Sequence, residues 1–184
     1  NIAITTDVIV GFPYETDELF NKTVENIKEI NFSQLHVFPY SPRKGTPAAE
    51  MEQIPAEIKQ ARFERMLTLQ NDIALEKNKT AEGVVTTASG LQYKVIKEGT
   101  GAMPTDSSIV SVHYTGTLLD GKKFDSSVDR GKPMEFPVKA VIPGWTEMLK
   151  LMKVGAKVQA WIPSELGYGA RKMPTIPANS LLVF

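Results

Sequence analysis

The sequence predicts an α+β protein in two parts, a βαβα segment over residues 1–80 and an antiparallel sheet with one short helix over residues 83–184. The hydrophobic pattern changes near Gly83, from β-branched runs separated by helical spacing to strict alternation. The charge changes at the same place: residues 1–82 carry nine basic and thirteen acidic side chains, a net −4, whereas the remainder carries twelve and eight, a net +4. These two changes indicate two separate units.

The first unit starts with a strand and a helix. Residues 2–11 (IAITTDVIVG) form a β-branched run typical of a parallel strand buried on both faces. Residues 17–30 then predict a helix, because Asp17 and Glu18 suit its positive end and apolar residues line one face. That face contains Phe20, Val24 and Ile27.

A second strand and a longer helix complete this unit. Residues 34–40 (QLHVFPY) predict another buried strand, in which we interpret His36 as a hydrogen-bonded strand residue. Residues 55–79 predict a long amphipathic helix. Its apolar stripe contains Ile58, Met66, Leu69 and Ile73. Two βα units cannot close a barrel, so we expect their sheet to need other cover.

The second unit is predicted from alternation and turns. Residues 91–96, 110–116 and 157–162 each alternate apolar and polar side chains, the period of a half-buried strand. The Asp120-Gly121 pair predicts a tight hairpin turn. One helix is expected from Pro143, ending before Gly155. Its apolar positions are Trp145, Met148, Leu149 and Met152.

Composition excludes several kinds of site. The chain has no cysteine, so a disulfide, a thiolate nucleophile and an iron–sulfur cluster on thiolates are excluded, and we expect no metal or cofactor. No run of about 18 apolar residues predicts a membrane span. The zero net charge argues against broad nucleic-acid binding. Because no export signal is visible, a cytoplasmic location is the default expectation, with the periplasm as the alternative.

Four motifs in the second unit carry a resemblance. The segments YKVIKEGTG, VHYTGTLLDGKKFDSS, VIPGWTEML and ELGYGA occur in this order between residues 93 and 170. In order and spacing they resemble an FKBP-type peptidyl-prolyl cis-trans isomerase over residues 83–184. The resemblance implies a twisted five-stranded antiparallel sheet around one short helix, with an aromatic pocket between them. It also implies a final strand longer than SLLVF, so we expect neighbouring strands to show an exposed edge.

The resemblance also implies a set of site residues. Those given catalytic roles are Tyr114, Asp125, Ile142 and Tyr168. Those given substrate-binding roles are Phe124, Arg130, Phe136, Val141, Trp145 and Phe184. In the family the tryptophan is the pocket floor, the amide of Ile142 faces the substrate carbonyl, and Tyr168 is the hydroxyl donor. Met134 replaces a wall aromatic common among members, which keeps the site apolar but loosens it.

Each group has an ordinary structural interpretation too. By periodicity alone, Trp145, Phe124 and Phe136 are core residues, and Asp125 with Arg130 is a solvated loop ion pair. His113 lies on the face opposite Tyr114, so we interpret it as either a surface residue or a hydrogen-bonded polar residue behind the site, and not as catalytic.

Residues 1–78 carry a different resemblance. The segments TTDVIVGFPYETDELF and LHVFPYSPRKGTPAAEM resemble the later part of the radical-SAM domain of tRNA methylthiotransferases, a partial (β/α) barrel. The three cysteines that hold the cluster in such enzymes are absent here. We therefore expect a non-catalytic segment in a fused or chimeric chain, in which Arg43 either binds an anion or is solvated.

The leading hypothesis is a cofactor-free peptidyl-prolyl isomerase that assists protein folding by acting on proline-containing polypeptides. The alternatives are a non-catalytic module that binds proline segments or macrolide inhibitors, and a methylthiotransferase remnant. The oligomeric state is left open, with a homo-oligomer as one arrangement.

Overall fold

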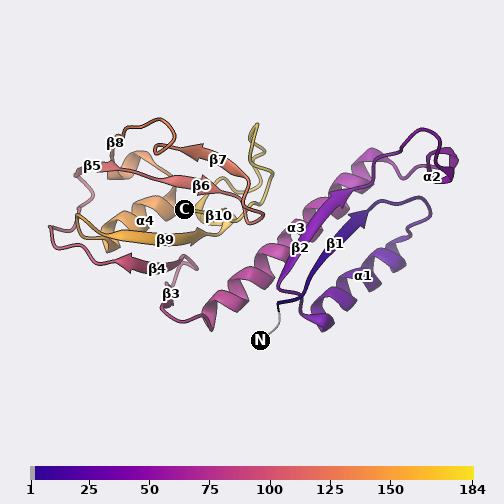
Figure 1. Cartoon of the computed structure of the whole chain (residues 1–184), viewed down its shortest axis with the longest axis horizontal. Coiled ribbons are helices and arrows are strands. Elements are labelled where there is room, and N and C mark those ends of the chain that lie inside the picture. Colours follow the sequence, from indigo (N-terminus) through magenta and orange to yellow (C-terminus); the bar gives the residue numbers. More distant parts are fainter. Residues whose placement is uncertain (1–2) are drawn as a thin grey trace. The chain divides into compact units, whose positions relative to one another are not determined.

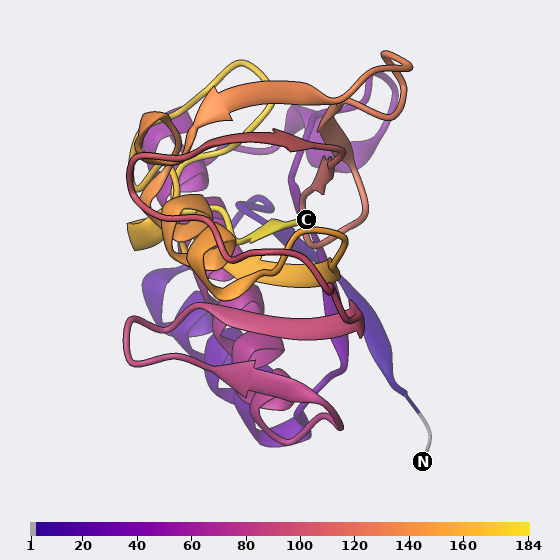
Figure 2. The ribbon, with the colours of Figure 1, turned by 90° about the vertical axis from the view of Figure 1, so that its left-hand side faces the viewer.

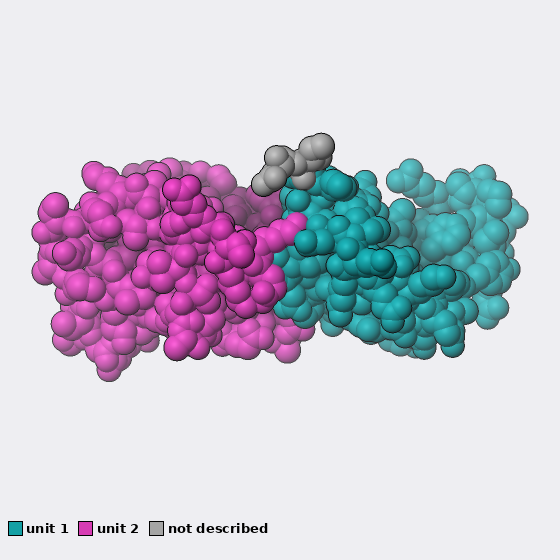
Figure 3. Space-filling model, turned by 90° about the horizontal axis from the view of Figure 1, so that it is seen from below, with its two compact units in different colours: residues 1–74 teal, residues 75–184 magenta. Residues whose placement is uncertain are grey.

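The computed structural model describes residues 3–184 and contains two compact units, one extending to Ala74 and the other from Leu75 to Phe184 (Figures 1 and 3). The boundary lies within helix α3 (Ala56–Lys79), whereas the sequence placed it at residues 80–83. The last turns of α3 belong with the second unit, where the Gln92 side chain donates a 2.8 Å hydrogen bond to the Leu75 carbonyl.

The first unit contains a two-stranded parallel sheet and two main helices, with the short helix α2 (Pro47–Glu50) in the loop before α3. Strand β1 (Thr5–Val10) pairs with β2 (Gln34–Pro39) in parallel, as predicted. Helix α1 (Asp17–Ile30) has the predicted bounds. It begins at Thr16, whose hydroxyl accepts the Leu19 N–H, and ends at Asn31 in the left-handed region.

The prediction that both strands are buried on both faces is wrong. Val8, Val10 and Leu35 lie in the core with apolar residues of α1 and α3, but the opposite face is open. There Ile9 lies across from Phe38, and the two residues are 56% and 51% exposed. Helices from this unit cover only one face of the sheet, so β-branched residues on the other face remain in water. Ile58 is also outside the core, at 40% exposure, although Met66 and Leu69 are buried as predicted.

A buried arginine ties α3 to the segment before α1. Arg62, only 7% exposed, donates to the Glu15 carbonyl, the Glu15 carboxylate and the Asp17 carboxylate, each at 2.8 Å. Glu15 also accepts the Gly11 N–H at 2.8 Å. The pairing compensates for the desolvation of the guanidinium.

The second unit is an antiparallel sheet with one principal helix (Figures 1 and 2). Its main sheet has the strand order β3-β4-β9-β10-β6-β7, and β5 pairs separately with β8. The bounds are β3 Val84–Thr86, β4 Gln92–Lys97, β5 Ile109–Val112, β6 Thr115–Thr117, β7 Lys123–Ser126, β8 Met134–Pro137, β9 Lys157–Ile162 and β10 Leu182–Val183. Within residues 3–184 the implied count of five strands is therefore wrong.

The predicted single strand over residues 110–116 is broken into β5 and β6. At the break, the Tyr114 N–H donates to the Ser127 hydroxyl at 2.8 Å, and the Ser127 N–H donates to the Tyr114 carbonyl at 3.0 Å. These bonds replace regular ladder pairing and redirect the chain from one sheet to the other. The predicted Asp120-Gly121 turn is confirmed, with Gly121 at φ 84° and the Lys122 N–H on the Asp120 carboxylate.

Helix α4 (Pro143–Leu151) packs on the sheet and begins at the predicted residue. Met148 and Leu149 are buried, and Met148 joins Ala160 and Ile162 of β9 in the core. Two short 3₁₀ helices lie near it in the chain: η1 (Val138–Ala140) directly precedes α4, and η2 (Ser164–Leu166) follows β9. The Thr146 hydroxyl donates to the Val138 carbonyl at 2.8 Å, which fixes the first turn of α4 against η1.

Candidate functional site

An aromatic cluster surrounds Trp145 at the start of α4. The centroid of its ring lies 5.0 Å from Tyr114, 5.5 Å from Phe136 and 5.0 Å from Phe184, each in an edge-on arrangement. Phe124 joins through Phe184 at 5.7 Å. Edge-on packing places positive ring edges against negative ring faces, so the cluster is stabilised in a defined geometry.

The local backbone explains why these rings meet. Pro143 occupies the first turn of α4, and the Ile142 carbonyl accepts the Trp145 N–H at 2.9 Å. Gly116 in β6 leaves room for two rings: a Cβ there would lie 2.6 Å from Phe124 and 2.8 Å from Phe184. A side chain at this position would therefore displace the cluster.

Three polar groups lie at the rim of the cluster. The Tyr114 hydroxyl donates to the Asp125 carboxylate at 2.5 Å, and Arg130 forms an ion pair with the same carboxylate. Arg130 also donates to the Tyr114 hydroxyl at 2.9 Å. Burial raises the pKa of Tyr114, and its hydrogen bond to Asp125 adds to this shift. Burial opposes ionisation of Asp125, but hydrogen bonds from Tyr114 and Arg130 outweigh it and hold the pKa of Asp125 below its ordinary value.

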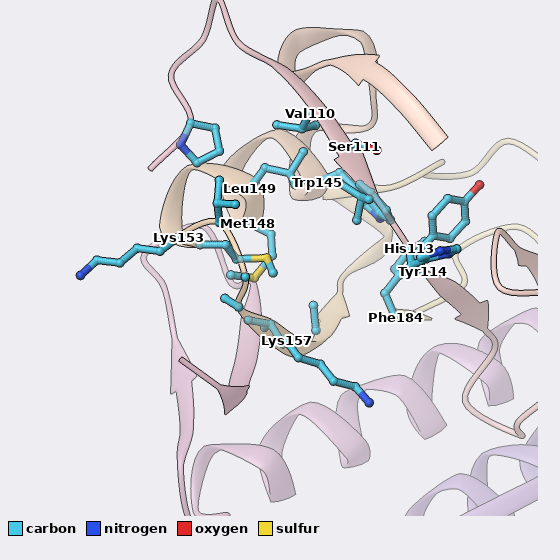
Figure 4. A pocket seen from close by; sticks show the side chains of 18 of the residues that line it. Val110, Ser111, His113, Tyr114, Trp145, Met148, Leu149, Lys153, Lys157 and Phe184 are labelled. Atoms are coloured by element: carbon cyan, nitrogen blue, oxygen red, sulfur yellow. The ribbon is translucent and has the colours of Figure 1, made fainter. Parts of the chain in front are cut away.

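A cavity of about 1150 Å³ adjoins one side of this cluster (Figure 4). Tyr114, Trp145 and Phe184 line it, whereas the other seven predicted site residues do not. The rest of its wall comes from β5, α4 and β9, including Met148 and Val158. The cavity therefore extends from the predicted pocket floor along the core side of α4.

The structure brings most of the predicted residues together. Three rings contact Trp145, Phe124 contacts Phe184, and Asp125 and Arg130 lie beside Tyr114. Val141 and Ile142 are half-buried directly before α4. Within residues 3–184 the Ile142 N–H has no hydrogen-bond acceptor. Tyr168 is separate: it is 36% exposed and makes no ring contact with the cluster among the described residues.

Sequence reasoning missed two supporting residues. Ser127 is fully buried, holds Tyr114 as described above, and lies 3.2 Å from His113 Nδ1. Gly144 lets α4 approach β9 closely. Ser127 lies in the motif that ends FDSS, and Gly144 lies in the motif that begins VIPGW. Only the three-dimensional contacts reveal the roles of these two residues.

The described part of the chain shows no group of three or more His, Cys, Asp or Glu placed to hold a metal ion. Among the helices of residues 3–184, none has the length and apolar character needed to cross a membrane.

Two family models match the chain. The model described as FKBP-type peptidyl-prolyl cis-trans isomerase covers residues 101–184. The model described as the domain amino terminal to FKBP-type peptidyl-prolyl isomerase covers residues 43–95, which include residues 43–78 of the segment that we compared with methylthiotransferases. The comparisons give no support to a methylthiotransferase fragment or a partial barrel.

Curated relatives agree with the first match. The FKBP-type peptidyl-prolyl cis-trans isomerase FkpA of Aeromonas hydrophila is 59% identical over 110 residues, which are 60% of this chain and 41% of that protein. The FKBP-type 22 kDa peptidyl-prolyl cis-trans isomerase of Escherichia coli is 57% identical over 60% of this chain and 54% of its own length. The chain thus spans about half the length of these relatives.

Solved structures extend the likeness. The crystal structure of FkpA from Escherichia coli matches with a TM-score of 0.66 and 35% identity, over 91% of this chain and 69% of that one. A peptidyl-prolyl cis-trans isomerase from Pseudomonas syringae matches with a TM-score of 0.57 and 34% identity, over 72% of this chain and 92% of that one. With the α+β fold and the aromatic site, these matches show that the chain belongs to the FKBP-type peptidyl-prolyl cis-trans isomerase family.

Proposed function

We propose that this chain catalyses cis-trans isomerisation of X-Pro bonds in flexible polypeptides. The observation that supports it most is the Trp145 ring, held edge-on by Tyr114, Phe136 and Phe184 beside a hydrogen-bonded polar rim. A proline ring packs favourably on such a flat apolar surface, and the rim can order the flanking peptide.

The chemistry requires little more than this environment. Rotation about a peptide bond faces a barrier of about 18–20 kcal/mol, because twisting removes its resonance. The twisted amide is less polar at its oxygen than the planar one, so water favours the planar state. An apolar surface that excludes water therefore favours the twisted state relative to the planar one.

One group of this chain can hold the substrate backbone, and three others keep the site in place. The Ile142 N–H points from the residue before α4 and can donate to a carbonyl flanking the proline. Arg130, Asp125 and Tyr114 hold one another, so the Tyr114 ring stays fixed against Trp145. No side chain in this scheme acts as a nucleophile or changes its covalent bonds.

The direct test follows a proline-limited relaxation, which takes about 10–100 s without catalyst. The 184-residue chain should accelerate cis-trans exchange of an Ala-Leu-Pro-Phe peptide, observed by NMR exchange spectroscopy. Trp145→Ala should remove the acceleration, and Ile9→Ala, in the first unit, is the matched control that should retain it. A folded chain that leaves the exchange rate equal to buffer would contradict the proposal.

A second candidate is a non-catalytic module for proline segments or macrolides. It is favoured by the position of Tyr168, the expected hydroxyl donor, outside the aromatic cluster. In that case a macrolide would quench Trp145 fluorescence while the exchange rate stays at the buffer value. Tyr168→Phe distinguishes the two candidates further, since it should lower the rate only if the hydroxyl reaches the bound peptide.

A further inference from the structure

The peptide group between Val141 and Ile142 has no hydrogen bond of its own. In the described part of the chain, neither the Val141 carbonyl nor the Ile142 N–H has a partner. Such a peptide group can rotate as a plate about the two bonds that flank it, because these are the soft dihedrals of the backbone. The direction of the Ile142 N–H, the donor that we assign to the substrate, must therefore be set by the residues on either side.

The start of α4 fixes the side that follows this peptide group. The Ile142 carbonyl accepts the Trp145 N–H at 2.9 Å and the Thr146 N–H at 3.1 Å. Pro143 also disfavours the helical region for Ile142, which lies at φ −57° and ψ 150°. The rotation that remains is that of the unbonded peptide group itself, about φ of Ile142 and ψ of Val141.

The Thr146 side chain holds the other side. Its hydroxyl donates to the Val138 carbonyl at 2.8 Å, eight residues earlier and outside α4. Threonines within helices can donate to the carbonyl four residues back, as Thr23 and Thr68 do in this chain. Thr146 instead closes residues 138–146 into a ring, and the unbonded peptide group lies inside this ring.

The Val138 end of the ring is itself held in place. Val138 is fully buried, and its N–H donates to the Ser108 carbonyl at 3.0 Å. Charged side chains also join η1 to α4, since Asp106 pairs with Lys139 at 3.4 Å and with Lys150 at 3.1 Å. These three side chains are 42–66% exposed, so their ion pairs contribute little. The hydroxyl bond to the buried residue is therefore the stronger side-chain tether between η1 and α4.

We propose that Thr146 is a positioning residue for isomerisation, which keeps the Val141–Ile142 peptide group turned so that its N–H faces the substrate carbonyl. This inference rests on the proposed function and adds to it a residue that does not contact the substrate. With the hydroxyl present, the donor is oriented before a peptide binds, so binding does not have to order it. Without the hydroxyl, the apparent affinity falls with the fraction of molecules that have the donor in place.

The test compares Thr146→Val with Thr146→Ser in the 184-residue chain. Valine keeps the branched shape but lacks the hydroxyl, whereas serine keeps the hydroxyl. NMR exchange of the Ala-Leu-Pro-Phe peptide, measured over a range of peptide concentrations, gives kcat and KM separately. Because the N–H binds the planar and the twisted substrate alike, Thr146→Val should raise KM about five- to tenfold and leave kcat within about twofold. Thr146→Ser should restore most of the lost affinity.

A second measurement observes the peptide group directly. NMR relaxation dispersion of backbone amides detects rotation on the microsecond to millisecond timescale. Thr146→Val should introduce such exchange at the Ile142 amide, and Thr146→Ser should not. Thr23→Val is the matched control, because it removes a helical hydroxyl bond in the first unit, and it should change neither KM nor the dispersion at Ile142.

The outcomes separate this proposal from the proposed function. An unchanged KM in Thr146→Val, or an equal rise in Thr146→Ser, would overturn the positioning role. A lower kcat at unchanged KM would place the effect on Trp145 and overturn it too. If the unaltered chain does not accelerate exchange, the proposed function fails and the role of Thr146 in isomerisation fails with it, whereas dispersion at Ile142 still decides whether the hydroxyl holds the peptide group.

A further variant guards against loss of the fold. If Thr146→Val is unfolded by circular dichroism, Thr146→Ala takes its place with the same expected results. Alanine also lacks the hydroxyl, but it has a higher helix propensity than valine and should keep α4 intact.

Discussion

Gly144→Ala tests how closely α4 must approach β9 to place Trp145. A Cβ built at Gly144 would lie 2.4 Å from Ile162 Cγ2 and 3.2 Å from the Leu166 carbonyl oxygen. Ile162 is 1% exposed and β-branched, so its Cγ2 cannot rotate away freely, and the carbonyl belongs to the backbone. The added methyl group must therefore push α4 outward.

Two effects of opposite sign decide the magnitude. Overpacking a buried site costs about 1–3 kcal/mol, whereas replacing glycine by alanine within a helix contributes up to about 1 kcal/mol in favour. We expect the free energy of unfolding of the second unit to fall by about 1–2 kcal/mol. Isomerase activity should fall as well, since Trp145 is the next residue and moves with the helix.

The assay is urea unfolding followed by tryptophan fluorescence. Trp145 and Trp161 are the only tryptophans and both lie in the second unit, so the signal reports that unit alone. Ile162→Ala removes the atom that obstructs the methyl group. In that background Gly144→Ala should be neutral or stabilising, which makes the double-mutant coupling about 2 kcal/mol. Additive effects of the two substitutions would refute the close-approach argument.

Three further predictions concern polar groups. The pKa of Asp125 is lower in the folded state than in the unfolded chain, so the unfolded state binds more protons between the two pKa values. The free energy of unfolding, measured by tryptophan fluorescence, should therefore fall as the pH drops through the folded-state pKa. This loss should be smaller in Asp125→Asn. Tyr114→Phe keeps the edge-on ring but removes the hydroxyl bonds to Asp125 and Arg130. Isomerase activity should therefore decrease several-fold, while a macrolide still quenches the fluorescence of Trp145. Unchanged activity would show that the polar rim is not needed. Arg62→Met leaves Glu15 without its buried partner and should destabilise the first unit by about 3–5 kcal/mol. Amide exchange at Val8 and Val10 measures this loss. Arg43 is exposed, so Arg43→Met is the control and should change the exchange rates little.

In the first unit, hydrophobic periodicity predicted the position of a helix but not the burial of the strands. Helix α1 was predicted with its observed bounds because its acidic first turn and its apolar face agree. The burial of β1 and β2 was mispredicted, because a β-branched run is compatible with one or two covered faces. The burial of Arg62 could not be predicted either, because its partners Glu15 and Asp17 are distant in sequence and meet it only in the fold.

The site was predictable from ordered motifs, but its geometry was not. Motif order identified Trp145 and its aromatic neighbours, which are far apart in sequence and meet through β6, β7, β8 and β10. It could not place Tyr168, whose loop position depends on the turn after η2. It also could not show that the alternating run over residues 110–116 changes sheets, because the Ser127 bonds that cause the break come from another segment.

The aromatic site and the cavity share their boundary residues, which couples their behaviour. Phe184 contacts Trp145, Tyr114 and Phe124 through its ring, and its backbone forms the last pair of β10 with Ala160. The end of the β10 ladder therefore restrains the Phe184 backbone. Since the same residue supports one wall of the Trp145 cluster, loosening this backbone pair should also disturb the ring geometry of the site.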